Sequence, residues 1–343
     1  MSKKRVVVLM GGRSPEHEIS LISGQEVVRN LPSKYIPTPI IISKDGSSWN
    51  VVSKQKLLSI NTKMIMKLKG TSKDLSISGQ KRIKGLSYIQ KNADIVFIAM
   101  HGPFGEDGTV QGMLELSGIS YTGSGVLASA LGMDKLRFRK ALEAEGIPLP
   151  RYVAVRKSEN IKKLYPKLGK PPYFVKPNDQ GSSVGCSIVK SYKELNKALD
   201  FAFEYSNIAL IDEYVSGTEV TCGILGNDKL IALPLVEIIQ KKADFFDYES
   251  KYSESGAEEI VPARISKTIT KKIQGLAIKT YKALNCRGFS RVDFIIKDGK
   301  HPLVLEINTI PGLTPMSLFP KAAKAAGVNY GKLLDEIIMY AIK

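Results

Sequence analysis

The N-terminal third of the sequence alternates apolar runs of strand length with a segment of helical spacing. Val6–Met10 is a continuous apolar run, which is typical of a parallel strand covered on both faces. Ser20–Asn30 follows with apolar residues at helical spacing, and Ile40–Ile42 and Ile95–Met100 are two further short apolar runs. This strand–helix–strand order predicts an α/β domain built on a parallel sheet.

The next segments differ in pattern. Residues 44–92 are lysine-rich and weakly periodic, so we interpret them as a peripheral insertion with a hairpin around Trp49–Val52. Leu127–Glu145 has helical spacing and predicts one helix. Gly146 is placed to end that helix, because glycine readily adopts the left-handed conformation of a C-cap.

The rest of the chain predicts a small strand-rich module followed by a larger one. The predicted strands are Tyr173–Lys176, Ser187–Val189, Ala209–Glu213, Glu219–Leu225, Leu230–Glu237, Phe289–Ile296 and Leu303–Ile307. The predicted helices are Lys193–Glu204, Lys267–Asn285 and terminal helices, with a polar loop at 241–260. We expect three domains, at residues 1–123, 124–213 and 214–343.

Composition sets the broad class. A chain of 343 residues suits two or three domains, and 43% hydrophobic and 24% charged residues are ordinary for a globular protein. No apolar run approaches the roughly 20 residues that span a bilayer. The three cysteines, Cys186, Cys222 and Cys286, have no metal-binding spacing. We therefore expect a cytoplasmic protein with free thiols and no membrane partner.

The net charge is +17, from 50 basic and 33 acidic residues. Such a surplus occurs in nucleic-acid-binding proteins, but here the basic residues are spread along the chain without an arginine-rich tail. We interpret the surplus as a solvated surface and expect no nucleic-acid partner. A small anionic substrate needs only a few of these charges.

The clearest chemical pattern is Arg291-Val-Asp293 followed by Glu306-Ile-Asn308, both in predicted strands. Residues two apart in a strand point to the same side, so Asp293, Glu306 and Asn308 meet if the strands pair as a hairpin. Two carboxylates and an amide oxygen are hard ligands that suit Mg²⁺ shared with substrate phosphates. The alternative is a polar outer face, but such a face seldom clusters acids without a lysine in so basic a protein.

A Gly/Ser loop, Gly181–Gly185, comes soon after Lys176 at the end of a predicted strand. Such a loop can present backbone N–H groups to a phosphate, and the lysine can reach a phosphate as a point charge. It is not a Walker A loop, because Gly-Lys-Ser/Thr is absent. The loop alone is equally typical of a flexible turn; Lys176 and the predicted metal ligands favour phosphate binding.

Two further segments follow predicted parallel strands. His101 lies at a carboxyl end, where ligands bind in open α/β sheets, so we predict that it contacts substrate. Gly11–Ser20 lacks the G-x-G-x-x-G spacing of a dinucleotide site. Within it, Glu16 lies at a predicted helix start, and the residues alone leave helix capping and ligand binding open. Hydrolase and zinc-enzyme motifs are absent from the sequence.

In this order, these segments resemble the D-alanine–D-alanine ligase family of the ATP-grasp superfamily. The resemblance is carried by His101 to Glu115, Tyr121–Gly125, Gly132–Lys135, Gly181–Gly185, Asp247–Tyr252, Arg291–Asp293 and Leu305–Gly312. It covers nearly all of the chain except residues 44–92. It implies an ATP-grasp fold preceded by a Rossmann-like N-terminal domain, and a homodimer. The implied reaction joins two D-alanines through an acyl phosphate, at the expense of ATP, for peptidoglycan synthesis.

The resemblance also implies roles for individual residues. For ATP these are Lys135, Lys176, Ser182, Ser183, Glu213, Tyr214, Val215, Glu219 and Lys251. For two Mg²⁺ ions, which Mn²⁺ can replace, they are Asp293, Glu306 and Asn308. For D-alanine they are Glu16, His101, Ser317 and Leu318. For catalysis they are Glu16, Ser182, Tyr252, Arg291 and Gly312.

The implied chemistry agrees with the residue inventory. Phosphoryl transfer needs cations, and an acyl phosphate needs protection from water, for which the polar 241–260 loop is the candidate lid. Tyr252 is neutral, and the chain has no histidine between His101 and His301. A protonated histidine in this loop would repel an ammonium group, so we expect D-alanine and not D-lactate as second substrate.

Two alternatives stay open at this point. One is another ATP-grasp ligase with a different acid or amine; D-serine is the hardest second substrate to exclude, because it adds only a hydroxyl. The other is a basic nucleic-acid-binding protein with a degenerate nucleotide site. The intact acids at Asp293 and Glu306 argue against that degeneracy.

Overall fold

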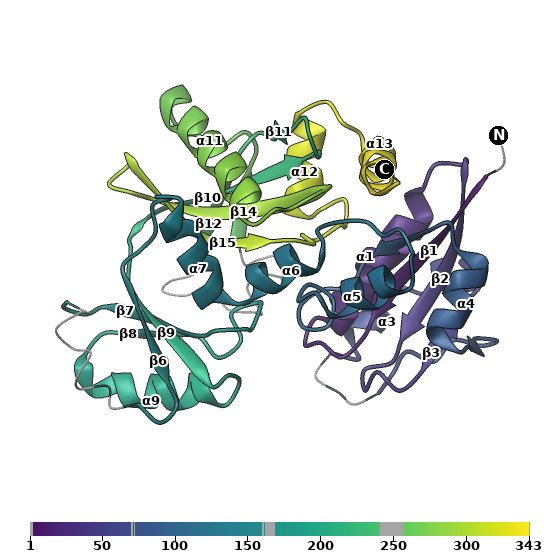
Figure 1. The fold of residues 1–343 in the computed structure, drawn as a ribbon, viewed down its shortest axis with the longest axis horizontal. Coiled ribbons are helices and arrows are strands. Elements are labelled where there is room, and N and C mark those ends of the chain that lie inside the picture. The colour runs from purple at the N-terminus through teal and green to yellow at the C-terminus, as the bar shows by residue number, and fades with distance from the viewer. Residues whose placement is uncertain are drawn as a thin grey trace.

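The structure is a computed structural model that describes residues 3–69, 71, 73–159, 161, 169–240 and 257–342. It contains three β-sheets, with helices α6 (Val126–Met133) and α7 (Lys135–Ala144) between them (Figure 1). Within the described residues, no helix is long and apolar enough to cross a membrane.

The first sheet holds the N-terminal strands in the order β4-β3-β2-β1-β5. The strands are β1 (Lys4–Gly11), β2 (Tyr35–Ile42), β3 (Trp49–Val51), β4 (Lys81–Arg82) and β5 (Ile95–Ile98). The helices of this region are α1 (His17–Asn30), α2 (Lys54–Leu58), α3 (Thr62–Met66), α4 (Gly85–Asn92) and α5 (Thr109–Leu116). Strand β1 pairs in parallel with β2 and β5, which confirms the predicted parallel sheet.

The segment 44–92 differs from its prediction. The hairpin is confirmed, because β3 pairs antiparallel with β2. The description as a peripheral insertion is wrong in one respect, since Leu57, Ile65 and Ile89 are fully buried in the first hydrophobic core. These residues lie in separate short helices, each too short to produce a visible helical period.

The predicted single helix over Leu127–Glu145 is wrong, because α6 and α7 are separate helices that meet at Asp134. The ψ of Asp134 is 99°, outside the helical region, and its carboxylate accepts a 2.9 Å hydrogen bond from the Arg137 N–H. Asp134 is therefore the N-cap of α7. Gly146 has a φ of +62° and follows α7, as predicted.

The second sheet has the order β6-β9-β7-β8 and is antiparallel throughout. Its strands are β6 (Tyr152–Arg156), which the sequence did not predict, β7 (Tyr173–Pro177), β8 (Ser187–Val189) and β9 (Ile208–Glu213). Helix α9 (Tyr192–Phe203) packs against one face, on which Tyr173 and Val175 are fully buried. Because side chains alternate along a strand, Phe174 and Lys176 lie on the opposite face.

The third sheet has the order β13-β12-β10-β14-β15, with β11 paired to β10. Its strands are β10 (Gly217–Leu225), β11 (Ile231–Ala232), β12 (Val236–Gln240), β13 (Ala257–Ile260), β14 (Phe289–Lys297) and β15 (His301–Asn308). The accompanying helices are α11 (Lys267–Ala283), α12 (Leu318–Ala325) and α13 (Tyr330–Ala341). The predicted pairing of β14 with β15 is confirmed.

Two predictions for this region need correction. The predicted strand Leu230–Glu237 is two strands, β11 and β12, since Pro234 between them cannot donate to a ladder. Of the predicted loop 241–260, the last four residues form β13, and 241–256 lie outside the described residues.

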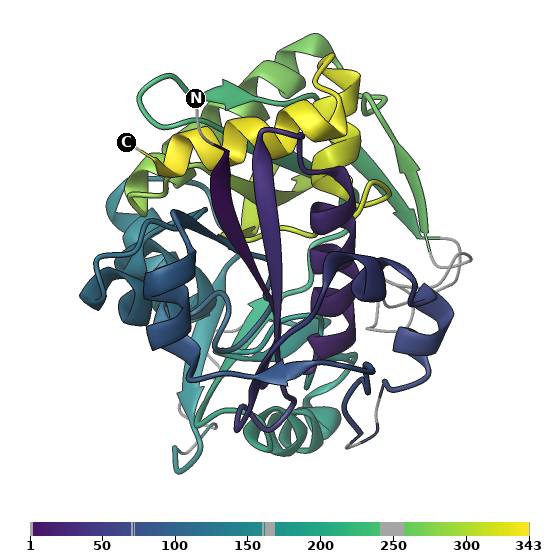
Figure 2. The ribbon, with the colours of Figure 1, turned by 90° about the vertical axis from the view of Figure 1, so that its right-hand side faces the viewer.

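The hydrophobic core of the first sheet is built from both ends of the chain. Leu333, Leu334, Ile337 and Ile338 of α13 are fully buried in the same core as β1. Helix α13 lies beside the strands of the first sheet in Figure 2, and Tyr35 Oη donates a 2.6 Å hydrogen bond to Asp335. The cysteines at 186, 222 and 286 are free thiols, as expected.

Candidate active site

Four polar side chains share one face of the β14–β15 hairpin. The strand register pairs Arg291 with Asn308 and Asp293 with Glu306, and directly paired residues point to the same side. Asp293 Oδ1 accepts hydrogen bonds from Arg291 Nε at 2.8 Å and Thr221 Oγ1 at 2.5 Å. Asp293 Oδ2 accepts from Arg291 Nη2 at 2.7 Å and Asn308 Nδ2 at 3.1 Å. The residues expected to meet on this hairpin are thus brought together.

The donor chemistry of this face fits a hard cation. Asp293 and Glu306 offer carboxylate oxygens, and Asn308 offers an amide oxygen once its side chain turns. Within the described ranges, no three His, Cys, Asp or Glu side chains are grouped so that they could hold a metal ion by themselves, so an ion here needs further oxygens from a ligand such as a phosphate. Both Asp293 oxygens already accept two hydrogen bonds each, so an ion that binds Asp293 must displace one of the donors Arg291, Thr221 and Asn308.

The Gly/Ser loop after β7 lies against the start of α7. Ser182 and Ser183 both have positive φ, +50° and +60°, which is uncommon for residues other than glycine. The Lys135 backbone N–H donates to the Asn178 carbonyl at 2.9 Å, and Lys135 Nζ donates to the Gln180 carbonyl. Burial lowers the pKa of Lys135, and the carboxylate of Glu306 opposes that shift. Lys135 therefore lies between the loop and the acidic face of β15.

Glu16 contacts the same loop from the N-terminal domain. Ser182 Oγ donates a 2.6 Å hydrogen bond to Glu16 Oε1. Glu16 occupies the N-cap position of α1 without a side-chain capping bond, so the structure does not support capping as the use of its carboxylate. Gly102 has a φ of +69°, and a Cβ there would lie 2.7 Å from Glu16 Oε2, so only glycine fits beside this carboxylate.

His101 is buried close to Glu16. Its Nε2 is 2.9 Å from Ser23 Oγ, and its Nδ1 is 3.1 Å from the Ile310 carbonyl and 3.8 Å from Glu106 Oε1. Burial alone lowers the pKa of His101, but the carboxylates of Glu106 and Glu16 and the Ile310 carbonyl outweigh it and raise the pKa. Burial also raises the pKa of Glu106. His101 and Glu106 therefore share a buried ionisable contact.

The loop after β15 runs from the hairpin face that carries Asp293 and Glu306 to His101. Its Ile310 carbonyl contacts His101, and further along Ser317 Oγ lies 2.8 Å from Thr314 Oγ1. A Cβ on Gly312 would lie 3.0 Å from Ser317 Oγ, so Gly312 and Ser317 are close neighbours. Leu318 begins α12 and packs against the first core.

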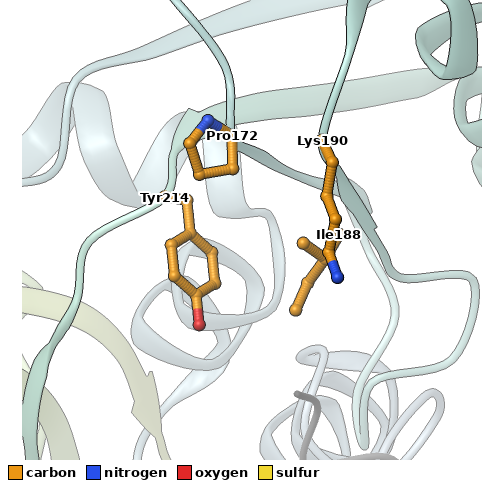
Figure 3. Close-up of a pocket in the computed structure, with 4 residues that line it drawn as sticks. All are labelled: Pro172, Ile188, Lys190 and Tyr214. Carbon is orange, nitrogen blue, oxygen red and sulfur yellow. The ribbon is translucent and has the colours of Figure 1, made fainter.

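A pocket of about 280 Å³ opens on the second sheet, lined by Pro172, Ile188, Lys190 and Tyr214 (Figure 3). The Tyr214 ring stands across this pocket from Ile188 and Lys190. Ile188 pairs with Phe174 in the strand register, so both lie on the face that carries Lys176. The pocket therefore opens on the same side of the sheet as Lys176.

Glu213 and Val215, which are also predicted to bind the nucleotide, are the sequence neighbours of Tyr214 in this pocket. The Glu213 carboxylate is directed to Arg151, accepting from its N–H at 3.0 Å and its Nε at 2.9 Å. Val215 is half-buried, and Glu219 lies in β10 opposite Ile238. Lys251 and Tyr252 lie outside the described residues.

Three charged residues near the site, of which Arg139 and Asp212 are buried and Glu106 is partly buried, were not singled out from the sequence. Asp212 and Arg139 form an ion pair beside Lys176, and Glu106 contacts His101. Asp212 could have been found from the sequence, because it is an acidic residue directly after the apolar run Ile208–Ile211. No signal in the sequence indicated Arg139, because arginines are common on helices and the burial of this one depends on the fold.

Comparison with known proteins identifies the family of the chain. The family description D-ala D-ala ligase N-terminus matches residues 5–124, and D-ala D-ala ligase C-terminus matches residues 141–339. The chain is 38% identical to a D-alanine–D-alanine ligase of Pelotomaculum thermopropionicum, over 99% of this chain and 97% of the relative.

Solved structures give the same result. The VanG D-Ala:D-Ser ligase of Enterococcus faecalis has a TM-score of 0.84 at 33% identity, covering 99% of each chain. The D-alanine–D-alanine ligase of Bacillus anthracis complexed with ATP has a TM-score of 0.74 at 35% identity, over 99% of this chain and 97% of that one. The predicted ATP-grasp fold is thereby confirmed. With both halves matched by family descriptions and the whole length matched by relatives and structures, the chain belongs to the D-alanine–D-alanine ligase family.

Proposed function

We propose that this protein joins two D-alanines to D-alanyl-D-alanine at the expense of ATP, for peptidoglycan synthesis. The observation that carries the proposal is the hydrogen bond from Ser182 to Glu16. It joins a loop suited to phosphate to a carboxylate suited to an ammonium group. A ligase that makes an acyl phosphate needs its phosphate donor and its amino acid at such a junction.

For ATP, we propose that the base enters the pocket beside Tyr214, with the 213–215 backbone at its edge and Glu219 at the ribose. The phosphates extend toward Lys176, Lys135, Ser182 and Ser183. The support is that the pocket and Lys176 share one face of the second sheet, and that Lys135 and the Gly/Ser loop contact each other. Lys251 completes this set by resemblance alone.

For the metal, Asp293, Glu306 and Asn308 are the proposed ligands of two Mg²⁺ ions, with Mn²⁺ as a substitute. Their common face and oxygen-donor chemistry support this assignment. When bound, the ions neutralise charge on the transferring phosphoryl group. Arg291 holds Asp293 by two hydrogen bonds, and once an ion takes over that carboxylate, Arg291 donates to the oxyanion.

For the amino acids, Glu16 holds the ammonium of the first D-alanine and His101 lines its pocket. Ser317 and Leu318 receive the carboxylate of the second D-alanine. Arg291 and the Gly312 N–H stabilise the tetrahedral intermediate, and one such donor is typically worth about 3 kcal/mol. Tyr252, with Ser182, completes the polar link to Glu16. The proximity of Gly312 to Ser317, and of Ile310 to His101, supports a single site for these groups.

At the level of the whole protein, we propose domains at 1–123, 124–213 and 214–343, a homodimer, and a cytoplasmic location where ATP is available. The division agrees with one sheet in each range. The second substrate is D-alanine; D-serine is the rival, because a structural neighbour is a D-Ala:D-Ser ligase.

The test is phosphate release with ATP, Mg²⁺ and single D- or L-amino acids, with products identified by mass. D-alanine should give both phosphate and the dipeptide. Turnover with another acid, but none with D-alanine, would refute the substrate assignment.

A further inference from the structure

A buried group of three charges lies behind the proposed phosphate-binding lysine. Arg139 of α7 is 0% exposed, Asp212 of β9 is 4% exposed and Lys176 of β7 is 7% exposed. Arg139 Nη1 donates to Asp212 Oδ1 at 2.7 Å, and Nη2 donates to Oδ2 at 2.6 Å. Lys176 Nζ lies 3.0 Å from the same Oδ2.

The group carries two positive charges and one negative charge. Burial alone raises the pKa of Asp212, but Arg139 and Lys176 together lower it, so the carboxylate stays ionised. One positive charge therefore remains uncompensated within the group. A buried surplus charge is costly unless a counterion approaches it, and the proposed function supplies one in the phosphates of ATP.

The geometry assigns that surplus charge to Lys176. The planar guanidinium of Arg139 engages both carboxylate oxygens of Asp212, and it lies over the Tyr152 ring at 4.6 Å from the centroid, which fixes its orientation. Among the described residues, Lys176 has one ion-pair contact, to an oxygen that Arg139 already uses, and its ammonium lies 5.8 Å from the centroid of the Phe174 ring. An ammonium has three donors, so Lys176 keeps donors for a phosphate.

We propose that Arg139 is a positioning residue for ATP. Because Arg139 pairs with both carboxylate oxygens of Asp212, the charge and the donors of Lys176 stay available to the phosphates. Without Arg139, Asp212 pairs with Lys176 alone, and the net charge of the group falls from +1 to zero. Arg139 does not contact the nucleotide itself, so its effect passes through Asp212. This inference rests on the proposed ATP site and adds two residues to it.

The experiment measures the affinity of the full-length protein for ATP with Mg²⁺ by calorimetry. Arg139→Gln should raise the Kd for ATP roughly tenfold or more, the size expected for one charge-assisted contact, while the KM for D-alanine stays unchanged. Arg139→Lys, which keeps the charge, should recover part of the loss. Arg137→Gln is the matched control, because Arg137 is exposed on the same helix.

The decisive variant is Arg139→Gln/Asp212→Asn. It removes the competing carboxylate, frees Lys176 and should restore ATP affinity toward that of the unchanged protein. A merely structural role for Arg139 predicts no such rescue. The double variant replaces the Arg139–Asp212 ion pair by two neutral amides and leaves Lys176 as the one charge of the group, for which bound ATP supplies the counterion. Its affinity stays informative if Arg139→Gln does not fold, provided that its own melting curve shows a folded protein.

The outcomes separate the two proposals. If the unchanged protein does not bind ATP, the proposed function fails. If it binds ATP, the inference is overturned by a folded Arg139→Gln variant with normal affinity, or by a double variant as weak as the single one.

Discussion

Ser182 Oγ lies 2.6 Å from Glu16 Oε1, although the two residues are 166 positions apart in the chain. Glu16 precedes the first helix of the N-terminal sheet, and Ser182 belongs to the loop after β7 of the second sheet. The bond therefore ties together parts of the molecule that have separate hydrophobic cores. A substitution at Glu16 is therefore expected to affect the loop that carries Ser182, and a substitution in that loop to affect Glu16.

Glu16→Gln tests the charge in this contact. The amide keeps an acceptor for Ser182 but cannot pair with an ammonium, so the KM for D-alanine should rise roughly 10- to 100-fold while the KM for ATP stays the same. Steady-state kinetics with each substrate varied in turn measures both values. Glu26→Gln, on the same helix, is the control. An unchanged KM for D-alanine would remove Glu16 from the substrate site.

Glu306→Gln tests the metal face. Replacing Glu306 should lower kcat by more than about 100-fold and weaken the Mg²⁺ dependence, because Asp293 is then the one carboxylate left among the proposed ligands. Glu258→Gln, at an exposed position of β13, should leave both kcat and the Mg²⁺ dependence unchanged. Melting curves must accompany the kinetics, since unfolding would also abolish turnover. A well-folded Glu306→Gln enzyme of normal rate would disprove the metal role.

The contact of His101 with Glu106 predicts a pH dependence of stability. The folded state raises the pKa of both groups, so it binds more protons than the unfolded chain. The contribution of His101 is complete below about pH 6.5 and is lost as the pH rises through its folded pKa. The free energy of unfolding should therefore fall as the pH rises above about 6.5, through the folded pKa of His101. Urea denaturation across this range should give a flatter profile for His101→Gln; equal slopes would contradict the assignment.

The choice of second substrate is tested by competition. With ATP, D-alanine and equal D-lactate or D-serine near neutral pH, mass analysis should find mainly D-alanyl-D-alanine. Against D-lactate, the reason is the neutral Tyr252 in a chain with no histidine between His101 and His301. This argument does not apply to D-serine, which has the same ammonium group and adds only a hydroxyl. A product that is mostly the D-lactate ester would show this reading of Tyr252 to be wrong, and a mostly D-serine product would change the second substrate only.

Asp134→Ala tests the break between α6 and α7. The variant loses the capping bond to the Arg137 N–H and should lower the free energy of unfolding by about 1 kcal/mol. Asp134→Ser, which can still cap, should recover most of that loss. If alanine is tolerated without cost, the two helices are held apart by packing alone.

Elements with a strong local signal could be predicted from the sequence. The two-residue spacing of Arg291 with Asp293 and of Glu306 with Asn308 predicted a shared face if β14 and β15 paired as a hairpin, and they do pair. The break at Asp134 was missed because apolar residues continue at helical spacing on both sides of it. Strand β6 was missed because its residues are half-buried without a clear alternation.

Contacts between distant segments could not be predicted. Arg139 and Asp212 are 73 positions apart, and nothing local to either residue indicates the other. Ser182 and Glu16 were assigned to one catalytic site only through the family resemblance, and nothing local to either residue indicates their hydrogen bond. The sequence thus gives the chemical groups, while the fold decides which of them are buried together.

The insertion of α13 into the core of the first sheet has a consequence for biosynthesis. Val6–Met10 leaves the ribosome long before Leu333 and Ile337, which complete the same core. At ~5–20 residues per second, the delay is on the order of ten seconds or more. During this interval, part of the apolar surface of the nascent N-terminal sheet stays uncovered. The portion translated first is therefore among the last to reach its final packing.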